Sequence, residues 1–252
     1  MHPSGSALNK QVEHLRCNHT SGALDLALEA IDLAGAWMQA GMDLHVLAAQ
    51  LQRMHPAIAA VRNVGRLLLQ DPRTACRRLE DLEQSLRGGN QRIAAHLKAL
   101  IAPAATIITL SNSSTVRHAL ISLRAANVFV MESLPGMEGR SMAQAVEKQL
   151  KDVGVRIQLI PDAMIGNVVP QVDCALVGID TFDISGAIYH KVGTLPLALC
   201  CRQFDKPLYA AGHSLKCVDG PLGAFPESDK PFAAQIFDLT PPQLITRIIT
   251  EE

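Results

Sequence analysis

Short apolar runs alternate with longer segments of helical periodicity from residue 103 onwards. The runs occupy residues 106–110, 127–131, 155–160, 174–177 and 207–211. Runs of this length and composition are typical of strands buried on both faces of a sheet, and the segments between them are long enough for helical crossovers. This alternation predicts an α/β fold, a Rossmann-like parallel sheet with helices on both faces.

The residues before this region have a different pattern, because apolar positions recur there at helical spacing and never alternate as in a strand. We expect helices over residues 21–40, 42–54, 57–69, 73–86 and 91–100. Ser21 is the expected N-cap of the first of these helices, and Gly88-Gly89 is the expected break between the last two. The sequence therefore predicts a helical domain over residues 1–102 and a Rossmann-like domain over residues 103–252, closed by a helix at 241–250.

Composition limits the classes of partner. The formal net charge is −1, from 23 basic and 24 acidic residues, so the chain lacks the basic excess of a general nucleic-acid binder and we expect no direct nucleic-acid contact. No apolar run has the length of a membrane span, and the first residues lack a hydrophobic signal core, so we expect a cytoplasmic protein without a membrane partner. The six cysteines form no C-x-x-C pair, which favours reduced thiols over a metal site.

Polar residues follow every expected strand. They are Ser111 to Thr115 after the first strand, Glu132 and Arg140 after the second, Asp162 after the third, Asp180 after the fourth, and His213, Ser214 and Lys216 after the fifth. Open parallel sheets bind ligands beyond the carboxyl ends of their strands. The clustering therefore predicts one binding site at this edge of the sheet.

The stretch from Val172 to Thr194 is the centre of this prediction. A buried strand ends at Asp180, a Gly-bearing loop follows, and His190, Lys191, Gly193 and Thr194 lead into the next helix. The free N–H groups of a helix start can hold an anion, and an arginine can bind a phosphate through two hydrogen bonds. We therefore expect a phosphorylated or anionic small-molecule ligand.

Ordinary structural roles also explain several of these residues. A serine such as Ser113 is a common helix N-cap, and Asp162 fits a turn better than a catalyst. His190 fits a structural histidine better than a base, while Lys191 and Glu132 are open between the two kinds of role. Asp180 is favoured as functional because the strand before it fixes its position.

Several motifs in fixed order resemble one superfamily. They are SGALDLALEAI, HPAIAAVRN, ESLPGMEGR, VGIDTF, HKVGT and FDLTPPQLITRIITEE. They are similar to motifs of the superfamily that contains the alpha, beta and delta subunits of eukaryotic initiation factor two B, methylthioribose-1-phosphate isomerase and ribose-1,5-bisphosphate isomerase. The resemblance implies a helical domain, a Rossmann-like domain, and a homodimer joined through the C-terminal domains.

The resemblance also implies a chemistry. The isomerases of the superfamily convert an aldose 1-phosphate into a ketose 1-phosphate without a metal or redox cofactor, using a cysteine and an aspartate as the acid/base pair. The aspartate corresponds to Asp180, but Ser111 stands at the position of the cysteine, and a hydroxyl is a much poorer proton donor and acceptor than a thiol. An arginine expected to contact phosphate is replaced by Leu134, and the asparagine before Lys191 is replaced by His190.

Two hypotheses follow. The first is a sugar-phosphate isomerase with a divergent active site, in which Asp180 and Ser111 are catalytic and no cofactor is needed. Its expected substrate-binding residues are Ser113, Ser114, Glu132, Arg140, His190, Lys191, Gly193, Thr194 and Lys216. The second is a non-catalytic protein that senses a sugar phosphate or nucleotide, as the initiation-factor subunits are regulatory. A proton-transfer partner for Asp180 would favour the first hypothesis.

Overall fold

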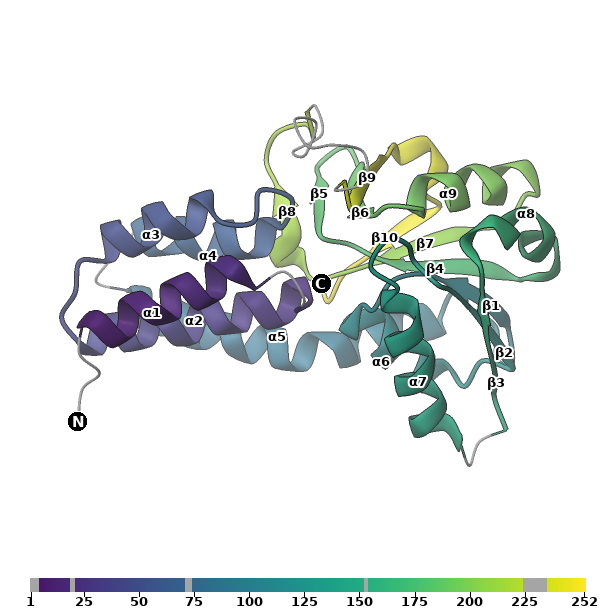
Figure 1. Cartoon of the computed structure of the whole chain (residues 1–252), viewed down its shortest axis with the longest axis horizontal. Coiled ribbons are helices and arrows are strands. Elements are labelled where there is room, and N and C mark those ends of the chain that lie inside the picture. Colours follow the sequence, from purple (N-terminus) through teal and green to yellow (C-terminus); the bar gives the residue numbers. More distant parts are fainter. Residues whose placement is uncertain (1–4, 19–20, 71–73, 152–153, 224–234) are drawn as a thin grey trace. The chain divides into compact units, whose positions relative to one another are not determined.

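The computed structural model describes residues 5–18, 21–70, 74–151, 154–223 and 235–252 (Figure 1). The chain divides into two compact units, Met1–Gly88 and Gly89–Glu252.

The described residues of the first unit form helices only. These are α1 (Gly5–Cys17), α2 (Ala23–Gln39), α3 (Leu44–Arg53), α4 (Ala59–Gln70) and the first part of α5 (Ala75–Lys98). Their apolar faces pack together around the buried side chain of Trp37, whose indole N–H donates to the Asp43 carbonyl at 3.0 Å. The helical character predicted from periodicity is therefore confirmed.

Two local predictions in this region are wrong. Gly88-Gly89 does not break a helix, because α5 runs without interruption through both glycines. A Cβ atom at Gly89 would lie 2.7 Å from Nδ1 of His213, so glycine is required there by close packing and not by a turn. Ser21 does not cap α2, since the N-cap residue is Gly22 and the Ser21 Oγ instead accepts a hydrogen bond from Asn18 Nδ2 at 3.0 Å.

The second unit is built on a parallel sheet, as predicted, but the sheet has six strands where five were expected. Its strands are β1 (Thr106–Thr109), β2 (Asn127–Met131), β3 (Arg156–Ile160), β4 (Cys174–Gly178), β7 (Leu208–Ala211) and β10 (Arg247–Ile249). Their order is β10-β7-β4-β1-β2-β3, and every neighbouring pair is parallel. The chain leaves β1 towards one edge and returns to β4 on the other side of β1. The β1/β4 boundary is thus the switch point at which doubly wound sheets bind ligands.

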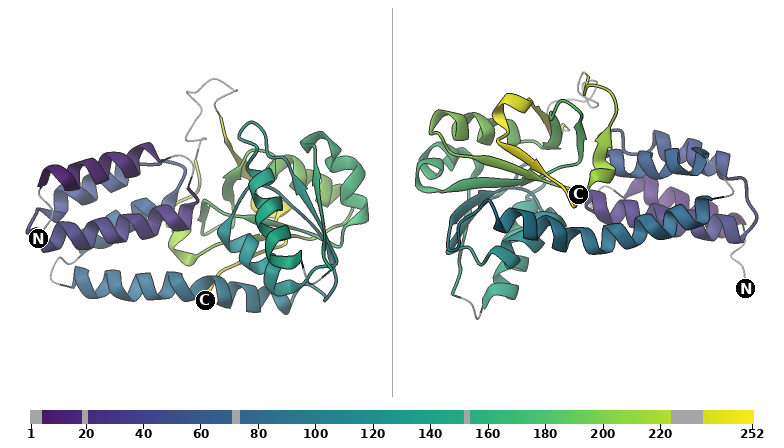
Figure 2. Two further views of the ribbon diagram at one scale, coloured as in Figure 1. Left: turned by 60° about the horizontal axis from the view of Figure 1, so that its bottom comes forward. Right: turned by 180° about the vertical axis from the view of Figure 1, so that it is seen from behind.

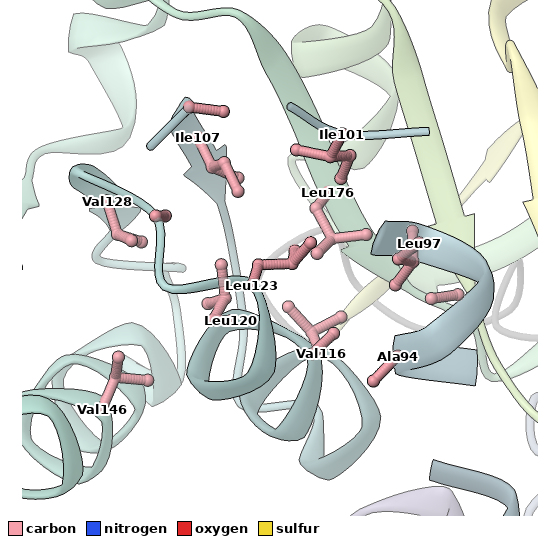
Figure 3. Packing of buried hydrophobic residues seen from close by; sticks show 14 of the residues in the cluster. Ala94, Leu97, Ile101, Ile107, Val116, Leu120, Leu123, Val128, Val146 and Leu176 are labelled. Atoms are coloured by element: carbon pink, nitrogen blue, oxygen red, sulfur yellow. The ribbon is translucent and has the colours of Figure 1, made fainter. Parts of the chain in front are cut away.

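Helices cover both faces of this sheet. Figure 2 shows α6 (Ser114–Leu123) and α7 (Glu138–Leu150) on one side, and α8 (Ile165–Val168) and α9 (Thr194–Gln203) on the other. Neighbouring residues of β1 point to opposite faces, so Ile107 joins the core under α6 and α7 while Ile108 joins the core under α8 and α9. Figure 3 shows the first of these cores, in which Ile107 and Val128 of the sheet face Val116, Leu120 and Val146 of the helices.

A second sheet was not predicted. It has the order β8-β5-β6-β9 and consists of β5 (Thr181–Asp183), β6 (Ile188–Lys191), β8 (Cys217–Val218) and β9 (Phe237–Thr240). The sequence had indicated a loop between Asp180 and His190, but β5 and β6 form an antiparallel hairpin there. Asp183 Oδ1 accepts the N–H groups of Ser185 and Ala187 at 2.8 and 3.2 Å, which closes the hairpin turn. Strands this short carry too few residues for an alternating pattern to show.

The prediction of a C-terminal helix over residues 241–250 is also wrong. Pro242–Leu244 forms one 3-10 turn, and the next residues form β10 at the edge of the large sheet beside β7. The segment ITRIIT is rich in β-branched residues, which favour a strand once a neighbouring strand offers its free edge.

Candidate functional site at the switch point of the sheet

Residues after β1 and β4 meet at the switch point. Ser111 follows β1 with a φ of 64°, and its N–H donates to Ser133 Oγ at 2.7 Å. Ser113 caps α6 by accepting the Val116 N–H at 3.4 Å, as its structural role predicted, and Ser114 is the first residue of α6. A left-handed conformation at a non-glycine residue is strained, and such strain is common at functional sites.

Gly178, the last residue of β4, brings two of the predicted side chains together. A Cβ atom at this position would lie 2.8 Å from Ser113 Cβ, 2.9 Å from Ser113 Oγ and 2.8 Å from His190 Nε2. Ser113 and His190 therefore flank one point at the carboxyl end of β4. Asp180 follows two residues later along the chain.

Asp180 is half-buried, and its carboxylate accepts no hydrogen bond from the part of the chain that the structure describes. Loss of water raises the pKa of Asp180 to about 6, although Lys216 and Lys191 act in the opposite direction. A carboxyl group with this pKa exchanges a proton readily near neutral pH.

Two buried lysines act on Asp180 through their charges. Lys216 donates from Nζ to the Ile179 carbonyl at 2.6 Å, and Lys191 Nζ lies 2.7 Å from Glu138 Oε1. Each lysine is only 4% exposed. Both act on the pKa of Asp180 and of His190, so the four groups share one electrostatic environment. The Glu138 carboxylate offsets the charge of the Lys191 ammonium, while the bond from Lys216 to Ile179 ends on a neutral carbonyl.

The hydrogen bonds of His190 fix its tautomer. Its Nδ1 lies 2.9 Å from Thr194 Oγ1, and that hydroxyl lies 2.6 Å from the Lys191 carbonyl. The carbonyl can only accept, so the hydroxyl proton points to it, and Nδ1 must carry the proton shared with Thr194. Burial, and then Lys216 and Lys191, lower the pKa of His190 to about 3. His190 is therefore a neutral imidazole whose Nε2 carries a lone pair.

The start of α9 differs from the prediction. Asp238 Oδ2 accepts the N–H groups of Gly193 and Leu195 at 2.9 and 3.0 Å, so these groups are not free to hold an external anion. Burial raises the pKa of Asp238 to about 6. Asp238 lies opposite His190 in the β6/β9 pair. Sequence reasoning missed it because it belongs to the unpredicted second sheet.

The loop after β2 is held by residues that the sequence singled out. Asp162 begins the 3-10 turn Asp162–Met164, as predicted, and its carboxylate accepts the N–H groups of Ser133 and Leu134 at 2.8 and 2.7 Å. Arg140 pairs with Glu132 at 2.8 Å and is more than half exposed. The Arg140–Glu132 pair is thus more exposed to solvent than Lys191 and Lys216, which are buried.

Other described parts of the chain offer weaker candidates for a functional site. A cavity of about 400 Å³ lies near the amino ends of β7 and β10, at the opposite edge of the sheet, and contains none of the predicted site residues. Among the described residues no three His, Cys, Asp or Glu side chains gather as a metal site would require. No described helix has the length and apolar character of a membrane span.

Residues 15–225 match the model of the Initiation factor 2 subunit family. The chain belongs to this family. It is 28% identical over 222 residues to a Pyrococcus furiosus protein named translation initiation factor eIF-2B subunit 2-like, covering 81% of this chain and 78% of that protein. It is 30% identical over 167 residues to ribose 1,5-bisphosphate isomerase of Archaeoglobus fulgidus, covering 58% of this chain and 52% of that protein.

Solved structures agree on the fold. The crystal structure of translation initiation factor eIF-2B from Pyrococcus horikoshii superposes with a TM-score of 0.79, at 22% identity, over 97% of this chain and 94% of that one. The family therefore contains proteins named for isomerisation and proteins named for translation, and this chain is similar to both. The resemblance inferred from the motifs is confirmed.

Proposed function

We propose that this chain is a sugar-phosphate isomerase that converts an aldose 1-phosphate into a ketose 1-phosphate. The observation that carries the proposal is Asp180, a carboxyl with a pKa of about 6, which follows β4 at the switch point of the sheet and is influenced by the charges of the buried Lys191 and Lys216. The similarity to a ribose 1,5-bisphosphate isomerase supports the reaction class.

The reaction needs what this site offers. The anomeric phosphate blocks spontaneous ring opening, so an acid must protonate the ring oxygen before hydrogen moves from C2 to C1. Asp180 supplies that proton, and Lys191 and Lys216 hold the phosphate. Ser111 and Ser113 lie at the same edge and offer hydroxyl groups to the sugar. Proton movement within the substrate requires no redox cofactor.

We also propose that the chain acts in the cytoplasm as a homodimer joined through residues 103–252. Exposed apolar side chains of the second unit support this arrangement, among them Leu134, Met137 and Leu199, which are 47%, 42% and 53% exposed. Burial of such side chains in a partner subunit is favourable.

One observation favours the alternative of a sensor that binds without turnover. Ser111 stands where the isomerases resembled by this chain have a cysteine, and the Asp180 carboxylate has no hydrogen-bonded proton partner within the described ranges. In a sensor the same lysines would bind a phosphate, and the response would pass to a protein partner.

Phosphorus NMR of the purified protein tests the proposal. The compounds are ribose 1-phosphate, ribose 1,5-bisphosphate and methylthioribose 1-phosphate, each with the wild type, Asp180→Asn and Asp205→Asn. Asp205 is exposed, it lines the cavity near the amino ends of β7 and β10, and its φ of 51° suits asparagine, so it is a matched control.

We expect a new ketose-phosphate signal with the wild type and Asp205→Asn, and none with Asp180→Asn. Line broadening without conversion would establish a sensor and refute the isomerase. Unchanged spectra with every compound would refute phosphate binding at this site.

A further inference from the structure

We propose that His190 is the second proton-transfer group of this site, with Nε2 as the reacting atom. It takes the part that a cysteine plays in the isomerases this chain resembles. The inference rests on the proposed isomerase function, and it answers how a chain with Ser111 at that position could still complete the reaction.

The first support is the fixed tautomer. Thr194 Oγ1 donates to the Lys191 carbonyl at 2.6 Å and lies 2.9 Å from Nδ1 of His190, so the imidazole proton stays on Nδ1. A histidine held through one nitrogen presents the lone pair of the other in a fixed direction, as in catalytic histidines oriented by a third group.

The second support is the place of Nε2. His190 is 3% exposed, and its Nε2 has no hydrogen-bond partner among the residues the structure describes. The atom lies close to Gly178, since a Cβ atom there would be 2.8 Å from Nε2 and 2.9 Å from Ser113 Oγ. A purely structural histidine commonly uses both nitrogens, whereas His190 bonds to described residues through Nδ1 alone.

The third support comes from the charges around it. Lys191 is the next residue on β6 and Lys216 lies in the segment after β7, and both lower the pKa of His190. Asp180 follows β4, and Asp238 lies opposite His190 on β9. In the free protein the lysines disfavour a protonated imidazole. A dianionic phosphate bound between them cancels much of this repulsion, so the basicity of Nε2 rises when substrate is present.

The protons balance over one turnover. Asp180 protonates the ring oxygen as the bond between C1 and that oxygen breaks. Nε2 takes the proton from C2, and the electron pair of that C–H bond forms the C1=C2 bond of an enol phosphate. The imidazolium returns its proton to C1 while the C2 hydroxyl passes its proton to Asp180 and becomes the carbonyl. Both residues end as they began.

The experiment uses the aldose 1-phosphate that the wild type converts. Rates are measured for the wild type, His190→Asn, His190→Gln and the control His118→Asn, in which an exposed histidine of α6 is changed. Asparagine is the residue expected at position 190 from the resemblance, and its amide can still bond to Thr194, so folding is preserved. Each reaction is also run in D2O, and the product is read for deuterium at C1.

We expect kcat to fall about 100-fold or more in both His190 variants, with KM changed less than about threefold. The wild type and His118→Asn should incorporate deuterium at C1, because the proton on Nε2 exchanges with solvent. The role of His190 would be overturned if His190→Asn retained wild-type activity, or if the product carried no deuterium at C1. The proposal of an isomerase would still stand in either case. A wild type that converts none of the compounds overturns the isomerase, and the role of His190 with it.

Discussion

The carboxylate of Asp238 accepts the N–H of Gly193 at 2.9 Å, so β9 caps α9 across 45 positions of sequence. The Leu195 N–H bonds to the same oxygen at 3.0 Å. An internal carboxylate thus occupies the helix start that the sequence offered to a phosphate. In the function proposed above, phosphate binding therefore falls to Lys191 and Lys216.

The pH dependence of stability tests this cap. The pKa of Asp238 is raised from 3.8 to about 6 by burial, so between these values the folded state binds more protons than the unfolded state. The free energy of unfolding that Asp238 contributes is therefore present below about pH 4 and is lost as the pH rises through 6. The raised pKa of Asp180 likewise makes the folded state less stable as the pH rises through 6.

Urea denaturation of the wild type and Asp238→Asn between about pH 4 and pH 7 measures the effect. The stability of the wild type relative to the variant should decline as the pH rises. Subtracting the two curves removes the opposite contribution of Glu251, whose pKa is lowered to about 2 and which stabilises at higher pH. A difference that stays constant or grows with pH contradicts the raised pKa of Asp238.

Asp162→Asn tests the loop after β2. The two carboxylate oxygens accept the N–H groups of Ser133 and Leu134, and the single amide oxygen of asparagine can serve only one of them well. We expect a loss of about 1–3 kcal/mol in the free energy of unfolding, measured by urea denaturation against the Asp205→Asn control. Unchanged stability with a large loss of kcat would instead make Asp162 catalytic.

Gly178→Ala tests the close approach of Ser113 and His190. The added methyl would lie 2.8 Å from Ser113 Cβ and from His190 Nε2, closer than nonbonded atoms allow, so one of them must move. Overpacking of this kind costs about 1–3 kcal/mol, and here it also disturbs the site.

Gly166→Ala is the matched control, because a Cβ atom at Gly166 meets nothing within 4 Å. Calorimetric titration with ribose 1-phosphate should show weaker binding for Gly178→Ala and unchanged binding for Gly166→Ala. Equal binding by both variants would mean that the close packing of Ser113 and His190 at Gly178 has no part in the site.

The sequence predicted the elements whose signal is local. Each strand of the parallel sheet except β10 is a largely apolar run, and Asp180 and Ser113 follow such runs closely, so the sequence alone predicts their place at the carboxyl edge. Asp162 was correctly assigned to a turn, because it begins the 3-10 turn Asp162–Met164 and the preference of aspartate for turns is a property of the residue itself.

Contacts between distant segments decided the rest. The strands β5, β6, β8 and β9 are too short to signal themselves and exist because they pair with one another, and β10 forms because β7 offers it a free edge. The tautomer of His190 depends on Thr194, and the cap of α9 depends on Asp238. A single sequence shows which side chains follow a strand, but the protonation and partners of those side chains depend on burial and on charges that only the folded chain brings together.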